Sequence, residues 1–234
     1  MKKEIHHANE RGESILDWLH AKFSFSFDSY FNPRRMGFGV LRVINDDIIA
    51  PGTGFGMHPH RDMEIITFVT EGALEHKDSI LSKGVVKAGE VQAMSAGTGI
   101  IHSEYNHSNE KPVKSFQIWI LPREKNLKPR YDQKDFTFNE NKLTEVVNGM
   151  KKTEALYINQ DAKISIGIFE REKVLDYKIR EGNGCFVMIV EGRALVENEK
   201  LGKRDAITIS EAEGFEVIFK EKSQIMVIEV PMKN

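Results

Sequence analysis

The sequence predicts an all-β protein with two domains, and three observations support this. Short apolar runs alternate with glycine and charged turns about every eight to twelve residues, which is typical of a β-sandwich or β-barrel. Long apolar stripes with the helical period of 3.6 are scarce. The 234 residues, 40% of them apolar and 29% charged, are enough for two globular domains of about 100 residues each.

Strands are expected wherever β-branched and aromatic residues gather between turn residues. In the first half these segments are GFGVLRVIN (37–45), EIITFVTEG (64–72), EVQAMSAGTG (90–99) and KSFQIWILP (114–122). In the second half they are KISIGIFE (163–170), CFVMIVEG (185–192), RALVENEKLG (193–202), AITIS (206–210), FEVIFK (215–220) and QIMVIEV (224–230).

Two further patterns describe how the halves relate. The segment 121–143 holds two prolines, many charges and few strand-forming residues, so it is the expected linker. The stretch ITFVTEGALEHKD (66–78) is similar to VMIVEGRALVENE (187–199), and each continues into a turn and another strand. This similarity predicts a duplicated β unit, although two unrelated hairpins could also produce it.

Charge and cysteine content exclude several classes of protein. With 33 basic and 35 acidic residues, the net charge of -2 gives neither the basic surface that nucleic acid requires nor a membrane-binding polybasic patch. A single cysteine, Cys185, lies in an apolar run and is expected to be a buried small hydrophobe. Without a signal-peptide pattern or an apolar span, we expect a cytoplasmic protein. We also expect a monomer.

The chain's eight histidines all lie in its first half, and three of them have spacings that suit a metal site. His58 and His60 are two residues apart, as are His102 and Glu104, so on two paired strands all four side chains could converge. Three imidazoles and a carboxylate suit iron, zinc, nickel, copper, cobalt or manganese. Each histidine alone would more simply be a packing or turn residue.

The remaining candidates favour structural roles. His76 lies in a polar strand and is expected in packing or at the surface, while His6, His7 and His107 are expected in solvent. The glycines of GTGFG (52–56) lack the strand–loop–helix context of a phosphate-binding loop, so they are expected in turns.

The residues around the histidines resemble the two cupin motifs, with departures. Counted back from Gly72, the glutamate of the first motif falls on Ile65, and Glu64 is one residue early, which on a strand places it on the other face. The second motif has extra residues between Gly89 and Gly99 and no proline. These departures resemble the pirin family, as do four stretches in order: NPRRMGFGVLRVINDD, HPHRDMEIITFVTEG, MSAGTGIIHSEYN and FQIWILP…PRYDQKDF.

The resemblance to pirins implies a bicupin, two stacked antiparallel β-barrels in one chain. It implies an N-terminal metal-binding domain at 1–130 and a C-terminal cupin domain without metal at 131–234. One divalent metal, with Fe2+ favoured, would be held by His58, His60, His102 and Glu104.

Bacterial pirins are described as quercetin 2,3-dioxygenases, which open a flavonol ring with O2 and release CO. In that reaction Glu104 would also be the general base that takes the proton of the 3-hydroxyl. The nuclear animal pirin is a transcription cofactor. An iron-bearing, redox-responsive protein-interaction module is therefore the alternative function, and a metal-sensing protein without turnover is a third.

Overall fold

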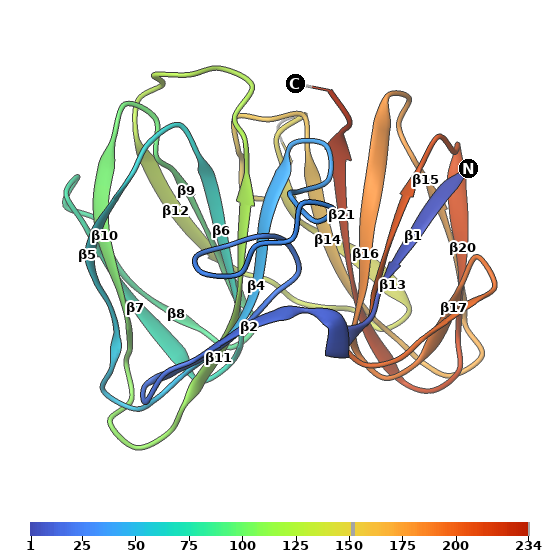
Figure 1. The fold of residues 1–234 in the computed structure, drawn as a ribbon, viewed down its shortest axis with the longest axis horizontal. Helices are drawn as coiled ribbons and strands as arrows, with labels where there is room; N and C mark the ends of the chain where they lie inside the picture. The colour runs from blue at the N-terminus through green and yellow to red at the C-terminus, as the bar shows by residue number, and fades with distance from the viewer. Residues whose placement is uncertain (151–152, 234) are drawn as a thin grey trace.

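A computed structural model describes residues 1–150 and 153–233 of the chain, and strands make up most of its regular structure. Figure 1 shows two barrels side by side, the first coloured blue to green and the second yellow to red apart from the dark-blue N-terminal strand that joins it. The one helical element in these ranges is a single 3-10 turn, Ala8–Glu10. The all-β prediction and the pair of antiparallel barrels are confirmed. Within the same ranges, no helix has the length and apolar character to cross a membrane.

The first barrel is built from a seven-stranded sheet, in the order β12-β9-β6-β11-β4-β3-β2, and a four-stranded sheet, β5-β10-β7-β8. Its strands are β2 (Gly12–Ile15), β3 (Leu19–Phe23), β4 (Leu41–Ile49), β5 (Gly54–His60), β6 (Glu64–Glu71), β7 (Ala73–Asp78), β8 (Lys83–Lys87), β9 (Glu90–Ser95), β10 (Ile100–Asn106), β11 (Val113–Ile120) and β12 (Arg130–Asp135).

The second barrel combines a six-stranded sheet, β1-β19-β16-β21-β14-β13, with a four-stranded sheet, β15-β20-β17-β18. Its strands are β1 (Lys2–His6), β13 (Lys142–Asn148), β14 (Lys163–Phe169), β15 (Val174–Lys178), β16 (Asn183–Glu191), β17 (Ala194–Val196), β18 (Glu199–Leu201), β19 (Ala206–Ser210), β20 (Gly214–Phe219) and β21 (Ser223–Pro231).

The strand order confirms the predicted duplication. The core order β9-β6-β11-β4 in the first barrel matches β19-β16-β21-β14 in the second, and β5-β10-β7-β8 matches β15-β20-β17-β18. The repeated Glu-Gly pair ends β6 and β16 in the same way, because Gly72 has φ 80° and Gly192 has φ 89°. Such left-handed backbone is unfavourable for residues with a Cβ, so a glycine is needed at both turns.

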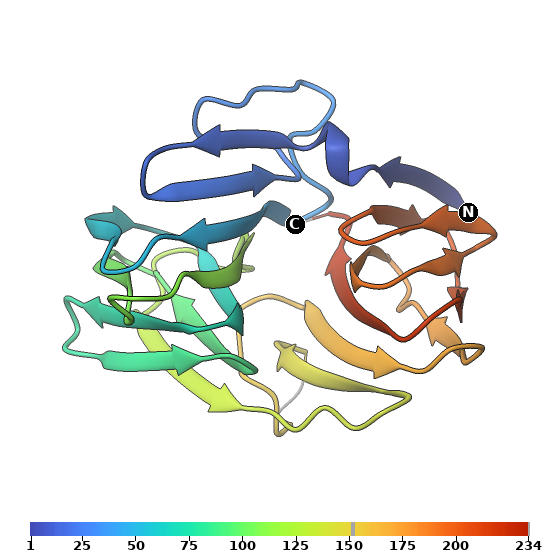
Figure 2. The same cartoon turned by 90° about the horizontal axis from the view of Figure 1, so that it is seen from below.

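Two strands depart from a simple division of the chain. The strand β1 pairs with β19 of the second barrel, and Figure 2 shows the N-terminal segment running from there along one side of the molecule to the first barrel. The strand β12 lies within the expected linker 121–143 and pairs with β9 of the first barrel. The boundary at residue 130 stays a prediction, and we propose to move it beyond β12 and to assign β1 to the second barrel.

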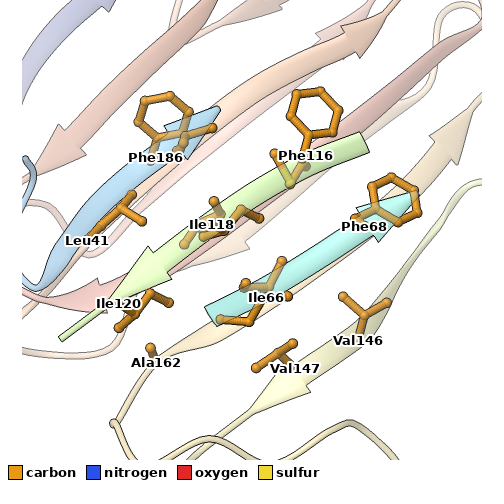
Figure 3. Packing of buried hydrophobic residues seen from close by; sticks show 14 of the residues in the cluster. Leu41, Ile66, Phe68, Phe116, Ile118, Ile120, Val146, Val147, Ala162 and Phe186 are labelled. Carbon is orange, nitrogen blue, oxygen red and sulfur yellow. The ribbon is translucent and has the colours of Figure 1, made fainter. Parts of the chain in front are cut away.

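The largest hydrophobic core lies between the barrels, where the two large sheets face each other (Figure 3). In β6, Ile66 and Phe68 point into this core, whereas Ile65 and Val69 point into the first barrel. A central strand buried on both faces is apolar almost throughout, which explains why β6, β11 and β16 were predictable from composition. The same alternation decides which polar side chains face the barrel interior.

Candidate metal centre

The three candidate histidines meet where β5 pairs with β10. These strands are antiparallel, with His58 opposite His102 and His60 opposite Ile100. Alternate residues of β5 point the same way, so both of its imidazoles face the barrel interior. Pro59, which lacks an N–H, is tolerated between them because β5 is the edge strand of its sheet.

The imidazoles form a compact group. Their ring centroids lie 4.4 Å apart for His58 and His102, 4.8 Å for His58 and His60, and 4.9 Å for His60 and His102. One nitrogen from each ring lies within 4.8 Å of the nitrogens of the other two. Nδ1 of His58 is 2.7 Å from the carbonyl oxygen of Gly56, an acceptor, which leaves Nε2 with a free lone pair. Nε2 of His102 is buried and has no hydrogen-bond partner.

The histidines are held in the form that metals bind. Burial lowers the pKa of His60 to about 4, and the neighbouring rings of His102 and His58 add to the effect. Burial also lowers the pKa of His102 to about 3, with contributions from His58 and His76. Both imidazoles are therefore neutral at pH 7, and the buried unpartnered nitrogen of His102 fits a divalent metal ion better than it fits a packing role.

Glu104 lies on the same strand as His102, buried in the barrel. Its Oε1 accepts hydrogen bonds from Thr67 Oγ1 at 3.2 Å and Gln92 Nε2 at 3.0 Å, and its Oε2 accepts one from Gln117 Nε2 at 2.8 Å. These donors come from β6, β9 and β11, so three strands of the large sheet fix one carboxylate. Glu104 forms a second group of potential ligands with His102 and His76, also within 4.8 Å of one another. His102 is common to both groups.

His76 contacts this centre directly, which the sequence did not predict. It lies on β7 opposite Glu104, is fully buried, and places Nδ1 3.5 Å from Nδ1 of His102. Its Nε2 lies 3.0 Å from Asp78 Oδ2, and its ring stacks on Tyr131 of β12 with centroids 4.3 Å apart. Because a carboxylate only accepts hydrogen bonds, Nε2 of His76 carries the proton that is donated to Asp78. Nδ1 of His76 can then accept a hydrogen bond from Nδ1 of His102. This chain of hydrogen bonds leaves Nε2 of His102 free for a metal.

A cavity of about 380 Å³ opens beside the imidazoles. Its volume is in the range of small-molecule sites, about 300–1,000 Å³. One wall is apolar and aromatic, and its other lining groups are carboxylates, amides and the three histidines. The apolar residues are Leu16, Trp18, Leu19, Ala21, Phe23, Phe27, Phe55 and Trp119, and the polar ones include Asn45, Asp47, Glu104 and Gln117.

Glu64 lies outside this site, as the motif offset indicated. Its carboxylate accepts from Ser95 Oγ at 2.7 Å and from Asn159 Nδ2 at 3.2 Å, on the face of β6 that points to the second barrel. In the second barrel, the strands β15 and β20, which correspond to β5 and β10, carry Tyr177 and Phe215 stacked at 5.0 Å.

Two other predictions can be compared with the structure. Cys185 is buried, as expected, and burial raises the pKa of its thiol. The prediction of a solvated His6 is wrong, because the last residue of β1 turns between the barrels and is only 4% exposed. Its ring lies between Phe25 and Phe186, at centroid distances of 5.9 and 5.8 Å.

The residues that sequence reasoning missed are Asn45, Asp47, Thr67, His76, Gln92 and Gln117. One signal could have found most of them: each is a polar residue at an inward position of a strand that is otherwise apolar or alternating. Five of the six are buried and Gln117 is half-buried, and a buried polar group needs a partner.

Comparison with known proteins finds a family match for each half of the chain. The family model for pirin matches residues 4–120, and the model for the quercetinase C-terminal cupin domain matches residues 146–230. A protein of Escherichia coli named quercetin 2,3-dioxygenase is 38% identical over 224 residues, which cover 96% of each chain.

Solved structures of a bacterial relative share the fold of this chain. The crystal structure of YhhW from Escherichia coli has a TM-score of 0.96 and 36% identity, covering 100% of both chains. The structure of the bacterial pirin YhhW in complex with nickel(II) has a TM-score of 0.94 and 36% identity, covering 98% of this chain and 99% of that one.

Proposed function

The chain belongs to the pirin family, and from this we propose that it is a metal-dependent dioxygenase that opens a flavonol-like ring with O2 and releases CO. We infer that His58, His60, His102 and Glu104 hold the single metal ion. Its proposed identity in the cell is Fe2+, while the nickel(II) complex of YhhW indicates that related sites accept other divalent ions.

The cavity is the observation that carries this proposal. An interaction module would need no space beside its metal, whereas a dioxygenase must admit an aromatic substrate and O2. A space of about 380 Å³ with an aromatic wall, next to the three imidazoles, of which those of His60 and His102 are neutral, supports the enzyme. The apolar wall would orient a planar ring and exclude water from it.

Glu104 is the residue proposed to move a proton. When bound, the metal would supply Lewis-acid stabilisation of the deprotonated substrate oxygen. Loss of the 3-hydroxyl proton makes the flavonol ring electron-rich enough to react with O2. Oε2 of Glu104 accepts one hydrogen bond, from Gln117, and so keeps one lone pair. Its two proposed roles would therefore alternate: that lone pair would hold the metal at one time and take the proton at another. Gln92 and Thr67 meanwhile hold Oε1 and fix the orientation of the carboxylate.

The test is a turnover assay on protein loaded with metal under anaerobic conditions. Metal content is measured first, and O2 uptake and CO release are then followed with several flavonols. We expect stoichiometric O2 uptake and CO release, and neither in protein stripped by a chelator. A loaded site that consumes no O2 with any flavonol would overturn the dioxygenase proposal.

That negative result would favour the alternative, an iron-bearing, redox-responsive interaction module. The monomeric state, the cytoplasmic location and a possible protein partner stay predictions that the turnover assay leaves open.

A further inference from the structure

Two inward-facing residues of β4 contribute polar groups to the cavity that no part of the proposed reaction uses. We propose that Asn45 and Asp47 form a hydroxyl-binding pair, which selects aromatic substrates that carry hydroxyl groups besides the one directed at Glu104. This inference rests on the proposed function and extends it, because it assigns the residues that would recognise the further hydroxyl groups of a flavonol.

The position of the pair follows from the alternation of β4. Asn45 and Asp47 are successive inward positions, opposite Gln117 and Ser115 of β11, and each is 4% exposed. Both line the cavity together with Glu104. Asp46 between them points the other way, toward the second barrel, where it pairs with Arg11 and Arg204. In this N-D-D sequence, the middle residue, Asp46, therefore lies in an ion-pair network, and Asn45 and Asp47 face the cavity.

The pair has no partner among the residues that the structure describes. Oδ1 of Asn45 and Oδ1 of Asp47 are both buried without a hydrogen bond. The other buried carboxylates in these residues are all hydrogen-bonded: Glu64 to Ser95, Glu104 to Gln117 and Glu229 to Tyr177. Burying a polar group without a partner is costly, so such groups point to a ligand that supplies one.

The chemistry of the two oxygens defines that ligand. Both are acceptors, so they fit O–H donors. Burial, together with the charges of Asp46 and Glu104, raises the pKa of Asp47 well above its usual range. A carboxyl group accepts a hydrogen bond in either protonation state. The aromatic wall requires the rest of the ligand to be a planar apolar ring.

The experiment measures binding without turnover, on nickel(II)-loaded protein in the absence of O2. The ligands share one ring system and differ in hydroxyl groups: 3-hydroxyflavone, galangin, kaempferol and quercetin. Binding is followed by quenching of tryptophan fluorescence, since Trp18 and Trp119 line the cavity. We expect at least one polyhydroxylated flavonol to bind about tenfold more tightly than 3-hydroxyflavone, the gain expected from one or two hydrogen bonds.

Variants separate ligand binding from structure. Asp47→Leu and Asn45→Leu should each abolish most of the preference while leaving affinity for 3-hydroxyflavone unchanged. Because each removes an unpartnered buried polar group, Tm should equal or exceed that of the wild-type chain. Asp47→Asn, which keeps a carbonyl oxygen, should retain the preference. Ile48→Ala, on the outer face of the same strand, is the matched control and should change no affinity.

The outcomes distinguish this inference from the proposed function. Preferential binding with no O2 consumption would sustain the hydroxyl-binding pair and overturn the dioxygenase. Binding of all four flavonols with equal affinity would overturn the pair alone, as would a lower Tm in Asp47→Leu with equal loss of affinity for every ligand. Failure of every flavonol to bind would overturn both.

Discussion

The Nδ1 atoms of His76 and His102 lie 3.5 Å apart inside the first barrel. This contact joins the candidate metal centre to Asp78, because the other nitrogen of His76 faces that carboxylate. His102 donates a hydrogen bond to His76, and His76 donates one to Asp78. This direction decides which nitrogen of His102 can bind a metal. We therefore expect His76 to position His102 as well as to pack against Tyr131.

Replacing His76 should weaken metal binding. His76→Phe preserves an aromatic ring against Tyr131 but removes the acceptor for His102, so the Kd for nickel(II) should rise about 10- to 100-fold, as is typical of residues that orient a metal ligand. His76→Gln keeps an acceptor and should recover part of the loss. Competition with a chelator measures both, with His107→Ala, an exposed histidine, as control. Equal affinity in His76→Phe and the wild-type chain would contradict the positioning role.

Glu104→Gln should reduce turnover strongly while changing the stability of the folded protein little. Removing a general base costs about 10²- to 10⁴-fold in rate, and glutamine still fills the space among Thr67, Gln92 and Gln117. The matched control is Glu64→Gln, a buried carboxylate on the opposite face of β6, which should keep full turnover. Turnover and metal content are measured on the same samples. Full metal content with unaffected turnover in Glu104→Gln would contradict the base assignment.

His6 should make the protein sensitive to acid. Its folded-state pKa is lowered from 6.5 to about 4, first by burial and then by Arg35. The unfolded chain therefore takes up a proton before the folded one, and His6 lowers stability as pH falls from about 6.5 to about 4. The slope is at most about 1.4 kcal/mol per pH unit.

The variant His6→Leu removes that proton uptake. The Tm difference between His6→Leu and the wild-type chain should be small at pH 7 and should grow toward pH 5, in metal-free protein. His60 and His102 contribute with the same sign and remain in both chains. A Tm difference that stays constant with pH would contradict the prediction.

Two glycines with nearly equal backbone angles should differ in their tolerance of alanine. Gly192 has φ 89°, and a Cβ there would lie 2.3 Å from Ser223 Oγ, whereas Gly182 has φ 81° and nothing within 4 Å. Gly182→Ala should cost only the backbone strain, about 1–2 kcal/mol. Gly192→Ala adds overpacking of about 1–3 kcal/mol. Urea unfolding of both variants measures the difference, and equal free energies of unfolding would contradict it.

Some strands and site contacts can be predicted from the sequence and others cannot, and the reasons are physical. Central strands such as β6 and β16 are buried on both faces, so their apolar composition reveals them. The strand β12, Arg130–Asp135, is charged and mostly half-buried, and only its pairing with β9 makes it a strand. Spacing predicted the convergence of His58, His60 and His102 because alternation within a strand is local. The contacts of Glu104 with Gln92 and Gln117 depend on which strands are neighbours, and spacing carries no such information.

Metal binding should distinguish the two overlapping groups of potential ligands, which share His102. A metal that binds only the folded chain stabilises it by about 2.7 kcal/mol at 100 times its Kd. If the metal occupies the group of His58, His60 and His102, then His60→Ala should abolish most of the nickel(II)-induced rise in Tm. His76→Gln should keep most of it at saturating metal. The reverse pattern, with the rise lost in His76→Gln and kept in His60→Ala, would place the metal among His76, His102 and Glu104 instead. His60 is the informative choice because its ring contacts Trp119 at 4.9 Å in the cavity wall, away from His76, so its loss leaves the chain from Asp78 to His102 intact.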